Sequence, residues 1–475
     1  MVTRAGTGRP FRNASEALNA YVHETLGKLG YAVEATQLPP PSTFAGENFL
    51  GIWSMQAFEH LTRLKEVEVA FFCDALQWAE PLELFKARKK VVFFHELGNS
   101  SLVWMGRDVD LCGNSRWTQE VLRSLGGYPD WAGGNLLCPD IFQRTTFVKC
   151  PLPALENLDG LGVGDPLPDD IWKGLEQDDC VYGIDSLREA NDQIHASLIL
   201  ALNVVARQHA DRRRFRLIVP ENKFSFLQAQ AANLPPGHPL ITTLSALKMT
   251  WQDLYLPIPN WVQQSDFFRM MRRARFFLAF NRIPESFAMM PLECVMQGCP
   301  VYTNGSGNMR FLLPNNGHGM HVEDTEGLLD GDFEEHLRVA RVIYGNAVQL
   351  DRGGSSPIRE ELGRGQDFIR EHYNPEVFFQ SFSAMLEQPR PASPSLHEMQ
   401  LELSTTVRRW NKAAGRLLTD ADDHYLEPPQ TKELEGLLGR TAADLFAHAS
   451  SHEQAFISEL WNKGVLTWSN DKGDL

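Results

Sequence analysis

The sequence is short of positive charge. Its 475 residues carry 45 lysine and arginine residues against 60 aspartate and glutamate residues, which gives a formal net charge of −15. Proteins that bind nucleic acid need a basic face for phosphate, so this balance argues against DNA or RNA as a partner. The sequence also lacks an apolar run long enough to span a bilayer, and no signal peptide is visible at its N-terminus.

Cysteine is scarce and scattered. The seven cysteines form no Cys-x-x-Cys pair, and the two that lie closest in sequence, Cys294 and Cys299, are five positions apart. An odd number of cysteines without regular spacing predicts reduced thiols in a cytoplasmic protein, not disulfides or a metal site.

What the sequence does contain is a repeated alternation of helices and strands. In the first half, an amphipathic helix is expected over about Ser15 to Leu29. Apolar runs at Val67–Asp74 and Lys90–Glu96 predict buried strands, and Val109–Ser115 and Asn135–Asp140 predict two shorter strands. This alternation predicts a doubly wound parallel sheet, in which ligands bind beyond the carboxyl ends of the strands.

The second half repeats this organisation. A segment rich in glycine, proline and aspartate, near Leu155 to Asp170, predicts a linker between two large domains. Strands are then expected at Asp179–Asp185 and Phe215–Glu221, and a helix at Ser265–Ala274. A further strand at Arg275–Asn281 leads directly into a polar turn.

The most informative segment runs from this turn to the glycine-bearing loop after it, Arg282 to Arg310. Because proline is favoured at the first helical position, Pro291 predicts that a helix begins there and that Ser286–Met290 form the turn before it. The free N–H groups and dipole of a helix start suit an anion. Glu285 precedes the turn, and Glu293 falls at the third helical position, so both carboxylates can flank one pocket.

Each carboxylate also has a simpler interpretation when it is taken singly. Glu293 could cap its own helix start in a capping box. Glu285 could be a solvated loop charge. These interpretations compete with a ligand site until the neighbouring segments are considered together.

The joint pattern resembles the retaining GT-B glycosyltransferases of glycosyltransferase family 4. It consists of Glu285, the residues SFAMMPL and Glu293, followed by GCPVY at Gly298–Tyr302 and GSGN at Gly305–Asn308. The resemblance extends from Ser15 to about Glu387 and is strongest over residues 276–322. It implies an α/β protein with two doubly wound, Rossmann-like domains facing a cleft. Residues 1–165 would form the acceptor domain, residues 166–388 the nucleotide-sugar donor domain, and residues 389–475 a helical extension.

The resemblance also implies an activity and roles for individual residues. The enzyme would move a sugar from a nucleotide-diphosphate donor to an acceptor, a small molecule, glycan or peptide, with retention of anomeric configuration and without a cofactor or metal. Glu293 would hold the ribose, and Glu285 would orient the donor sugar. His95, otherwise an ordinary loop histidine, would contact the sugar from the other domain. The phosphates and the sugar edge would meet main-chain N–H groups of the turn, formed by Ser286, Phe287, Ala288, Met289 and Met290.

One departure from the family concerns the cations that neutralise the donor diphosphate. The family places Gly-Arg, and then a lysine, after the first strand of the donor domain, whereas this sequence has Gly183-Ile184 and reaches the lysine position near Ala190. The candidate substitutes are Arg188, Arg282 and Arg310. The departure leaves open a non-catalytic GT-B subunit that supports a partner glycosyltransferase. A sugar-nucleotide epimerase or a phosphorylase on the same architecture is a further alternative.

Two smaller features of the sequence carry expectations of their own. Ala288 replaces a glycine of the family motif, which is a mild change if its φ angle is negative. After a proline-rich linker, the last eighty or so residues show helical periodicity, including Val407–Leu418 and Glu453–Trp468. They predict a helical appendage packed on the body of the protein. The alternative is a recognition module that exposes Trp461 and Trp468.

Overall fold

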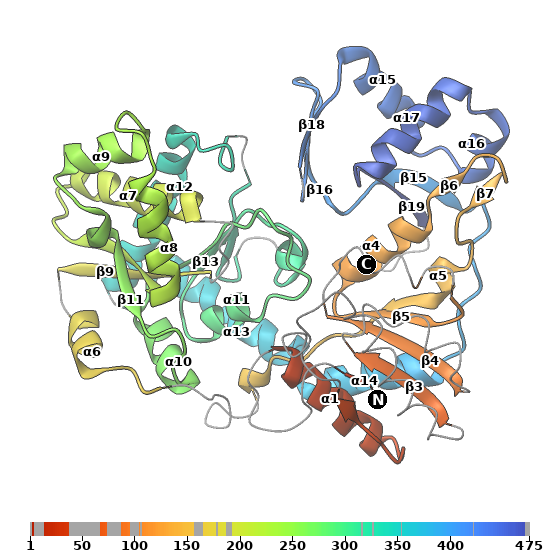
Figure 1. The fold of residues 1–475 in the computed structure, drawn as a ribbon, viewed down its shortest axis with the longest axis horizontal. Coiled ribbons are helices and arrows are strands. Elements are labelled where there is room, and N and C mark those ends of the chain that lie inside the picture. Colours follow the sequence, from red (N-terminus) through yellow and green to blue (C-terminus); the bar gives the residue numbers. More distant parts are fainter. Residues whose placement is uncertain are drawn as a thin grey trace, which may run out of the picture. The chain divides into compact units, whose positions relative to one another are not determined.

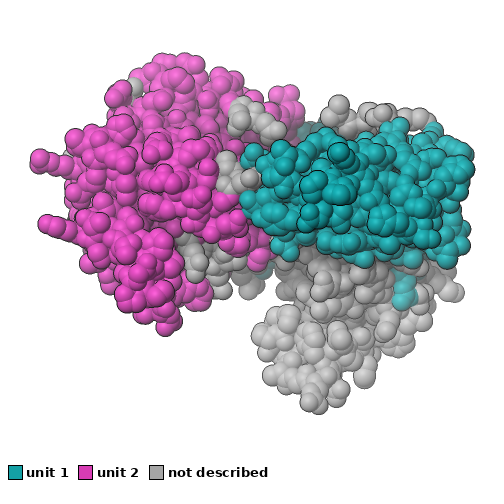
Figure 2. Space-filling view, turned by 90° about the horizontal axis from the view of Figure 1, so that it is seen from above, with its two compact units in different colours: residues 1–8, 13–151, 375–475 teal, residues 9–12, 152–374 magenta. Residues whose placement is uncertain are grey.

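The computed structural model describes residues 2–3, 14–37, 67–73, 87–95, 104, 107–155, 165–176, 179–186, 192–314, 317–324, 327–352, 354–420 and 422–470. The chain divides into two compact units (Figure 2). Unit 1 comprises residues 1–8, 13–151 and 375–475, and unit 2 comprises residues 9–12 and 152–374. Each unit is built around its own six-stranded sheet.

The sheet of unit 2 is parallel throughout and has the strand order β11-β10-β9-β12-β13-β14. Renumbered along the chain this is 3-2-1-4-5-6, the order of a doubly wound nucleotide-binding sheet. The strands are β9 Cys180–Asp185, β10 Arg214–Pro220, β11 Tyr255–Ile258, β12 Phe276–Ala279, β13 Val301–Thr303 and β14 Met320–Val322.

Helices cover both faces of this sheet (Figure 1). In β12, Phe276 and Leu278 join the core beneath one helical layer, while Phe277 and Ala279 join the core beneath the other. Burial on both faces explains why the strands are continuously apolar rather than alternating. The first layer includes α7 Asp192–Gln208 and α12 Phe333–Asp351; the second includes α10 Gln264–Arg273, α11 Met289–Met296 and α13 Pro357–His372. Further helices of this unit are α6 Asp169–Leu175, α8 Glu221–Ala232 and α9 Pro239–Leu247.

The sheet of unit 1 is also parallel, with the order β2-β1-β3-β4-β5-β8. Helices α1 and α14 pack on one face, with Tyr21 against Phe378 and Phe71 against Phe382, at ring-centroid distances of 6.1 and 5.3 Å. The elements are β1 Val2–Thr3, α1 Ala14–Lys28, β2 Thr36–Gln37, β3 Val67–Cys73, β4 Ala87–Phe94, β5 Asp110–Gly113, α4 Arg116–Gly126, α5 Ile141–Arg144, β8 Thr145–Phe147 and α14 Pro375–Glu387.

The predicted strand at Asn135–Asp140 is not part of this parallel sheet. Only β7, Asn135–Leu136, is extended there, and it pairs antiparallel with β6, Pro129–Asp130. The chain reverses at Gly134, whose φ of +62° is a conformation that glycine adopts without steric cost. The last strand of the parallel sheet is β8 instead.

The C-terminal segment contains helices, as predicted, but also strands. The helices are α15 Pro428–Leu437, α16 Ala442–His448 and α17 Ser451–Asn462. The strands are β15 Met399–Leu403, β16 Val407–Asn411, β17 Arg416–Thr419, β18 Asp423–Tyr425 and β19 Leu466–Asn470. The helix expected over Val407–Leu418 is therefore wrong. Those residues form the antiparallel β16–β17 pair, because the chain turns back at Gly415, which has a φ of +63°.

The C-terminal segment packs within unit 1 through two tryptophans, among other residues. Trp461 and Trp468 are buried, and their indole N–H groups donate to the carbonyls of Ser124 and Gly127 at 2.9 and 2.8 Å. A buried indole with its N–H paired stabilises packing and offers no surface to a partner. The appendage interpretation is thus confirmed, and the recognition module built on exposed tryptophans is wrong.

Two further sequence expectations concern thiols and membranes. All seven cysteines are free, and all but Cys180 are buried. Among the helices of the described ranges, none combines the length and the apolar character needed to cross a membrane.

Candidate functional site

The candidate site lies in unit 2 at the point where the strand order reverses. Strands β9 and β12 are neighbours in the sheet, although the chain leaves them toward opposite edges. Connections that diverge in this way open a crevice at the carboxyl ends of the two strands, where doubly wound sheets bind ligands. Ser186 follows β9 at this edge, and Phe280 and Asn281 follow β12. The predicted turn with Glu285 begins here.

The backbone of Glu285 is hydrogen-bonded to the glycine loop that follows β13. Its main chain forms a parallel bridge with Gly307, and its carbonyl accepts a hydrogen bond from the N–H of Asn308 at 2.7 Å. Its carboxylate is half-buried and accepts from Asn281 Nδ2 at 3.4 Å. The backbone of Glu285 is therefore fixed, and its carboxylate has a partner within the protein.

Gly307 makes this arrangement possible. Its φ and ψ of +64° and −136° are angles that side-chain-bearing residues avoid. A Cβ atom at this position would lie 2.4 Å from the carbonyl oxygen and 2.5 Å from the nitrogen of Glu285. The predicted glycine loop after β13 is thus required for the close approach of two backbone segments.

Asn281 connects this loop to the sheet. Its backbone N–H donates to Asn304 Oδ1 at 2.9 Å, and its carbonyl accepts from Asn304 Nδ2 at 2.8 Å. Its side-chain Oδ1 accepts from the hydroxyl of Ser186 at 3.4 Å, while its Nδ2 reaches Glu285. Asn281 and Asn304 are almost fully buried. All the polar groups of Asn281 are therefore used to fix the Glu285 carboxylate relative to β9, β12 and β13.

Helix α11 begins two residues earlier than predicted. It starts at Met289, so Pro291 occupies the third helical position and Glu293 the fifth. Proline is tolerated at the third position because the N–H it lacks would have no acceptor within the helix. The residue before the helix, Ala288, has a φ of −92°, which confirms that alanine can replace the glycine of the motif here. Met289 and Met290 therefore belong to the helix, not to the turn.

The side chains of this helix start point into the protein. Ala288 is buried, and the side chains of Phe287, Met289 and Met290 pack on the core on this side of the sheet. Phe287 also contacts Tyr373, at a ring-centroid distance of 6.3 Å. Since Ala288 has no polar side-chain atom to cap the helix, the backbone amides of the first turn are the chemically active groups of the segment.

Glu293 is not the capping glutamate of its helix. It lies beyond the position at which a capping box forms, and its Oε1 accepts from Gln264 Nε2 at the start of α10, at 3.4 Å. Loss of water around the half-buried side chain raises the pKa of Glu293 to about 7. A carboxylate kept in such a position at a cost in stability is typical of a functional site.

This elevated pKa predicts a pH-dependent stability effect for Glu293→Gln. Unfolded Glu293 ionises near 4.5 and folded Glu293 near 7, so the folded protein loses stability as pH rises between these values. Replacing Glu293 by glutamine should therefore stabilise the protein by about 1 kcal/mol at pH 5 and by about 3 kcal/mol at pH 8. Calorimetric unfolding of both proteins across this range measures the difference. The exposed residue Glu459 provides a matched Glu→Gln control, and a gain of equal size there would contradict the assignment.

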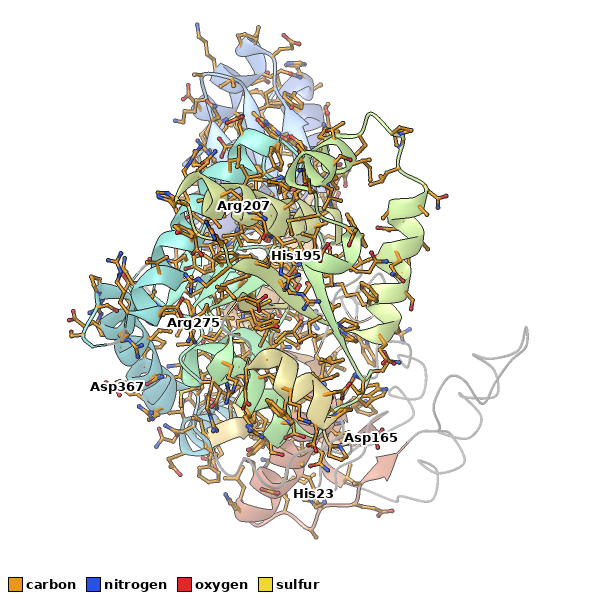
Figure 3. The ribbon with its side chains drawn as sticks, turned by 90° about the vertical axis from the view of Figure 1, so that its left-hand side faces the viewer. His23, Asp165, His195, Arg207, Arg275 and Asp367 are labelled. Carbon is orange, nitrogen blue, oxygen red and sulfur yellow. The ribbon has the colours of Figure 1, made fainter. Side chains whose placement is uncertain are left out.

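A buried charge network at the end of β9 is not predictable from the local sequence pattern. Asp185, the last residue of β9, contacts His195 Nδ1 at 2.5 Å and Lys223 Nζ at 3.2 Å, and all three side chains are almost fully buried. Figure 3 labels His195. Lys223 also donates to the carbonyl of Ser186 at 2.8 Å, and His195 Nε2 accepts the N–H of Phe280 at 3.1 Å.

This network joins β9, α7, α8 and the end of β12. Burial alone would raise the pKa of Asp185, but the charge of Lys223 and the hydrogen bonds from His195 and Lys223 outweigh it and lower that pKa. Lys223 neutralises the charge of Asp185. The pair therefore holds the ends of two strands without placing a net charge in the interior. The network's members are 10 to 38 positions apart in sequence. The only local signal for the network is a charged residue, Asp185, at the end of a predicted strand.

The predicted cations occupy different settings. Arg282 is exposed and donates to the carbonyl of Leu329. Arg310 is half-buried in the turn after the glycine loop, with its guanidinium 5.3 Å from the ring centroid of Phe311. Arg188 lies outside the described residues. In the ranges that are described, no cluster of three or more histidine, cysteine or acidic side chains could hold a metal ion.

His95 lies in unit 1, directly after β4 at the carboxyl end of that strand, as predicted. It is buried, its ring packs edge-on against Phe93 at 4.9 Å, and its carbonyl accepts from Asn114 Nδ2 at 2.7 Å. Asn114 follows β5 and is itself held by the hydroxyl of Thr118 at 2.9 Å. The backbone at His95 is therefore fixed by the neighbouring strand end.

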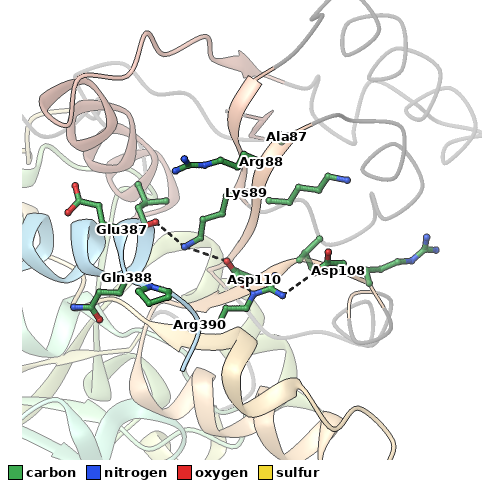
Figure 4. A pocket seen from close by; sticks show the side chains of 13 residues that line it. Ala87, Arg88, Lys89, Asp108, Asp110, Glu387, Gln388 and Arg390 are labelled. Atoms are coloured by element: carbon green, nitrogen blue, oxygen red, sulfur yellow. Dashed lines mark hydrogen bonds and ion pairs between the residues drawn. The ribbon is translucent and has the colours of Figure 1, made fainter. Parts of the chain in front are cut away.

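Unit 1 also has a cavity of about 700 Å³ at the opposite, amino-terminal ends of β4 and β5 (Figure 4). Its charged groups bind one another and the last turn of α14. Lys89 Nζ donates to the carbonyls of Met385 and Leu386 at 2.6 and 3.1 Å, and Arg390 contacts Asp110 and Asp108 at 2.6 and 3.1 Å. This cavity anchors the chain that leaves α14 and shares no residue with the candidate site.

Comparison with known proteins identifies the architecture. No protein-family model matches the sequence, and no curated protein matches it significantly. An alpha,alpha-trehalose-phosphate synthase (UDP-forming) from Burkholderia vietnamiensis has a similar structure, with a TM-score of 0.51 and 9% identity over 81% of this chain and 96% of that one. A sucrose-phosphate synthase from Thermosynechococcus elongatus gives 0.51 and 12% over 78% and 92%. A glycosyltransferase from Rickettsia africae gives 0.50 and 13% over 77% and 88%.

These likenesses, together with the two Rossmann-like sheets, define the fold as the GT-B architecture of nucleotide-sugar glycosyltransferases. The fold expected from the sequence is confirmed. At these identities the comparisons establish the fold alone, and the activity has to be argued from the site.

Proposed function

We propose that this protein is a glycosyltransferase that moves a sugar from a nucleotide-diphosphate donor to an acceptor, with retention at the anomeric carbon. One observation carries the proposal. Two half-buried carboxylates, Glu285 and Glu293, flank the start of α11 at the strand-order reversal of a GT-B sheet. Carboxylates accept hydrogen bonds from sugar hydroxyls, and a helix start attracts phosphate. The two carboxylates therefore suit the ribose and the donor sugar, and the helix start suits the diphosphate between them.

The donor would bind along α11. The first-turn amides of α11 would meet the diphosphate, because the neighbouring side chains pack inward and leave the backbone for the ligand. Glu293 would accept hydrogen bonds from the ribose hydroxyls, which restores the polar partners that burial removed. Glu285, fixed by Asn281, would orient the hydroxyls of the donor sugar.

The charge of the leaving diphosphate needs stabilisation beyond the helix start. Lys223 is unsuited to this role because its charge is matched by Asp185. We assign the role to the predicted arginines Arg188, Arg282 and Arg310, of which Arg282 and Arg310 flank the Glu285 turn and the glycine loop in sequence. The proposed reaction needs no metal or cofactor.

The acceptor would bind to the other domain. We assign unit 1 to acceptor binding and unit 2 to donor binding. Helix α14, which the sequence predicts in the donor domain, packs on the sheet of unit 1 and so belongs to the acceptor side, and residues 389–475 would support unit 1. His95 would contact the donor sugar from the acceptor side, with its backbone held by Asn114. The acidic composition and the free cysteines support a cytoplasmic location and a carbohydrate or small-molecule acceptor, not nucleic acid.

A thermal-shift screen with uridine-, guanosine-, adenosine- and thymidine-diphosphate sugars tests the proposal directly. We expect at least one donor to raise the melting temperature of the wild-type protein, because a ligand that binds only the folded state stabilises it. Glu293→Gln should reduce the shift. A protein that binds none of these donors would contradict the enzyme assignment and favour a non-catalytic subunit. For a donor that binds, NMR of the first-formed product gives the anomeric configuration, and inversion would refute retention.

A further inference from the structure

Trp261 is a large aromatic residue left open to solvent on a well-anchored loop. It follows β11 in unit 2, and 73% of its surface is exposed. The loop is hydrogen-bonded twice to Asp165: the N–H of Asp165 donates to the carbonyl of Trp261 at 3.2 Å, and the N–H of Gln263 donates to the carbonyl of Asp165 at 3.0 Å (Figure 3 labels Asp165). Asn260 Oδ1 also accepts the N–H of Asn222 at 2.8 Å. An exposed indole on a fixed backbone suits a binding role.

The position of Trp261 relates it to the candidate donor site. Gln264, three residues further along, contacts the Glu293 carboxylate at 3.4 Å. Three residues of extended chain span at most about 10 Å, so the backbone of Trp261 lies within about 10 Å of the backbone of Gln264, whose side chain contacts this carboxylate. Trp261 also follows the carboxyl end of β11, at the same edge of the sheet as the carboxyl ends of β9 and β12.

The sheet provides a length scale for the ligand. β11 and β12 are three strand intervals apart, which corresponds to about 14 Å at the usual strand spacing. An extended nucleoside diphosphate has this order of length. With its ribose at Glu293 and its phosphates at the start of α11, its base would extend toward the β11 edge, where Trp261 lies.

We propose that Trp261 is the platform on which the nucleobase of the donor stacks. This inference rests on the proposed function, because it takes Glu293 as the ribose-binding residue. The indole face would cover one face of the base, and the anchored loop would hold the indole in place before the ligand arrives. Because every base has a π face, stacking contributes affinity with little choice among bases. The inferred ligand class is any purine or pyrimidine nucleoside diphosphate.

The test compares Trp261→Ala and Trp261→Phe with the wild-type protein by calorimetric titration of UDP, GDP, ADP and dTDP. We expect Trp261→Ala to weaken binding of each nucleotide that the wild type binds by about 5- to 150-fold, and Trp261→Phe to retain most of the affinity. Tyr425→Ala removes another exposed aromatic residue, in unit 1, and should have no effect. Ribose 5-phosphate, which lacks a base, should compete equally well for the wild type and for Trp261→Ala.

The outcomes separate this inference from the function on which it rests. If the wild type binds nucleotides, Glu293→Gln weakens binding and Trp261→Ala does not, the stacking role is refuted while the proposed function stands. If the wild type binds no nucleotide, both fail. If Trp261→Ala changes the oligomeric state in ultracentrifugation and leaves nucleotide affinity unchanged, Trp261 belongs to a protein interface and the stacking role is again refuted.

Discussion

Glu285→Gln is expected to lower the turnover number for sugar transfer by about 10²–10³-fold, while the protein folds and binds its donor normally. Glutamine has nearly the same shape and can still contact Asn281, so the fold should tolerate it. It lacks the negative charge that would face the donor sugar as positive charge develops at the anomeric carbon. Losing one preorganised polar contact to a transition state costs roughly 2.7–4 kcal/mol, which sets the expected range.

Steady-state kinetics with the donor identified by the thermal-shift screen measure this effect. Glu323→Gln is the matched control, since Glu323 also follows a strand of the unit 2 sheet but pairs with Arg338 at 3.0 Å, outside the site. We expect Glu323→Gln to keep wild-type turnover. If Glu285→Gln keeps it as well, Glu285 does not act on the donor sugar, and the site assignment fails.

Gly307→Ala should destabilise unit 2 by more than about 3 kcal/mol, or displace the Glu285 turn and abolish activity. The new Cβ would overlap the backbone of Glu285 at 2.4–2.5 Å, and backbone atoms cannot move aside as a flexible side chain can. The positive φ of Gly307 adds a further cost. Calorimetric unfolding measures the first outcome, and transfer kinetics measure the second.

Gly298→Ala provides the control that isolates the close contact. Gly298 also has a positive φ, +82°, but a Cβ there would meet nothing within 4 Å. Its replacement should therefore cost only about 1 kcal/mol, the conformational penalty alone. Equal effects of the two substitutions would show that the approach of Gly307 to Glu285 has no energetic importance.

The local features of the site could be predicted because they depend on short-range rules. Apolar runs predict β9 and β12, and the positions of Glu285, Pro291 and Gly307 predict a turn, a helix start and a glycine loop. Helix α11 starts two residues before the position that Pro291 predicts, since proline is compatible with the third helical position as well as the first. The helix expected at Val407–Leu418 failed because periodicity over a short segment does not reveal a tight turn.

The residues that hold the site together could not be predicted from local pattern. Asn281 and Asn304 are 23 positions apart, and Lys223 is 38 positions from Asp185, so their contacts form only when strands β9, β12 and β13 lie side by side. The elevated pKa of Glu293 likewise depends on burial, which no spacing of residues reveals.

The sequence by itself determined the parts: alternating strands and helices, two carboxylates around a helix start, and a glycine loop after the next strand. These features arise from backbone preferences and hydrophobic periodicity, which act over a few residues. The tertiary structure alone decided that β9 and β12 meet where the strand order reverses, that Asn281 fixes Glu285, and that Trp261 is left exposed after β11. The physical reason is that burial and hydrogen bonding between distant segments depend on how the sheet is assembled.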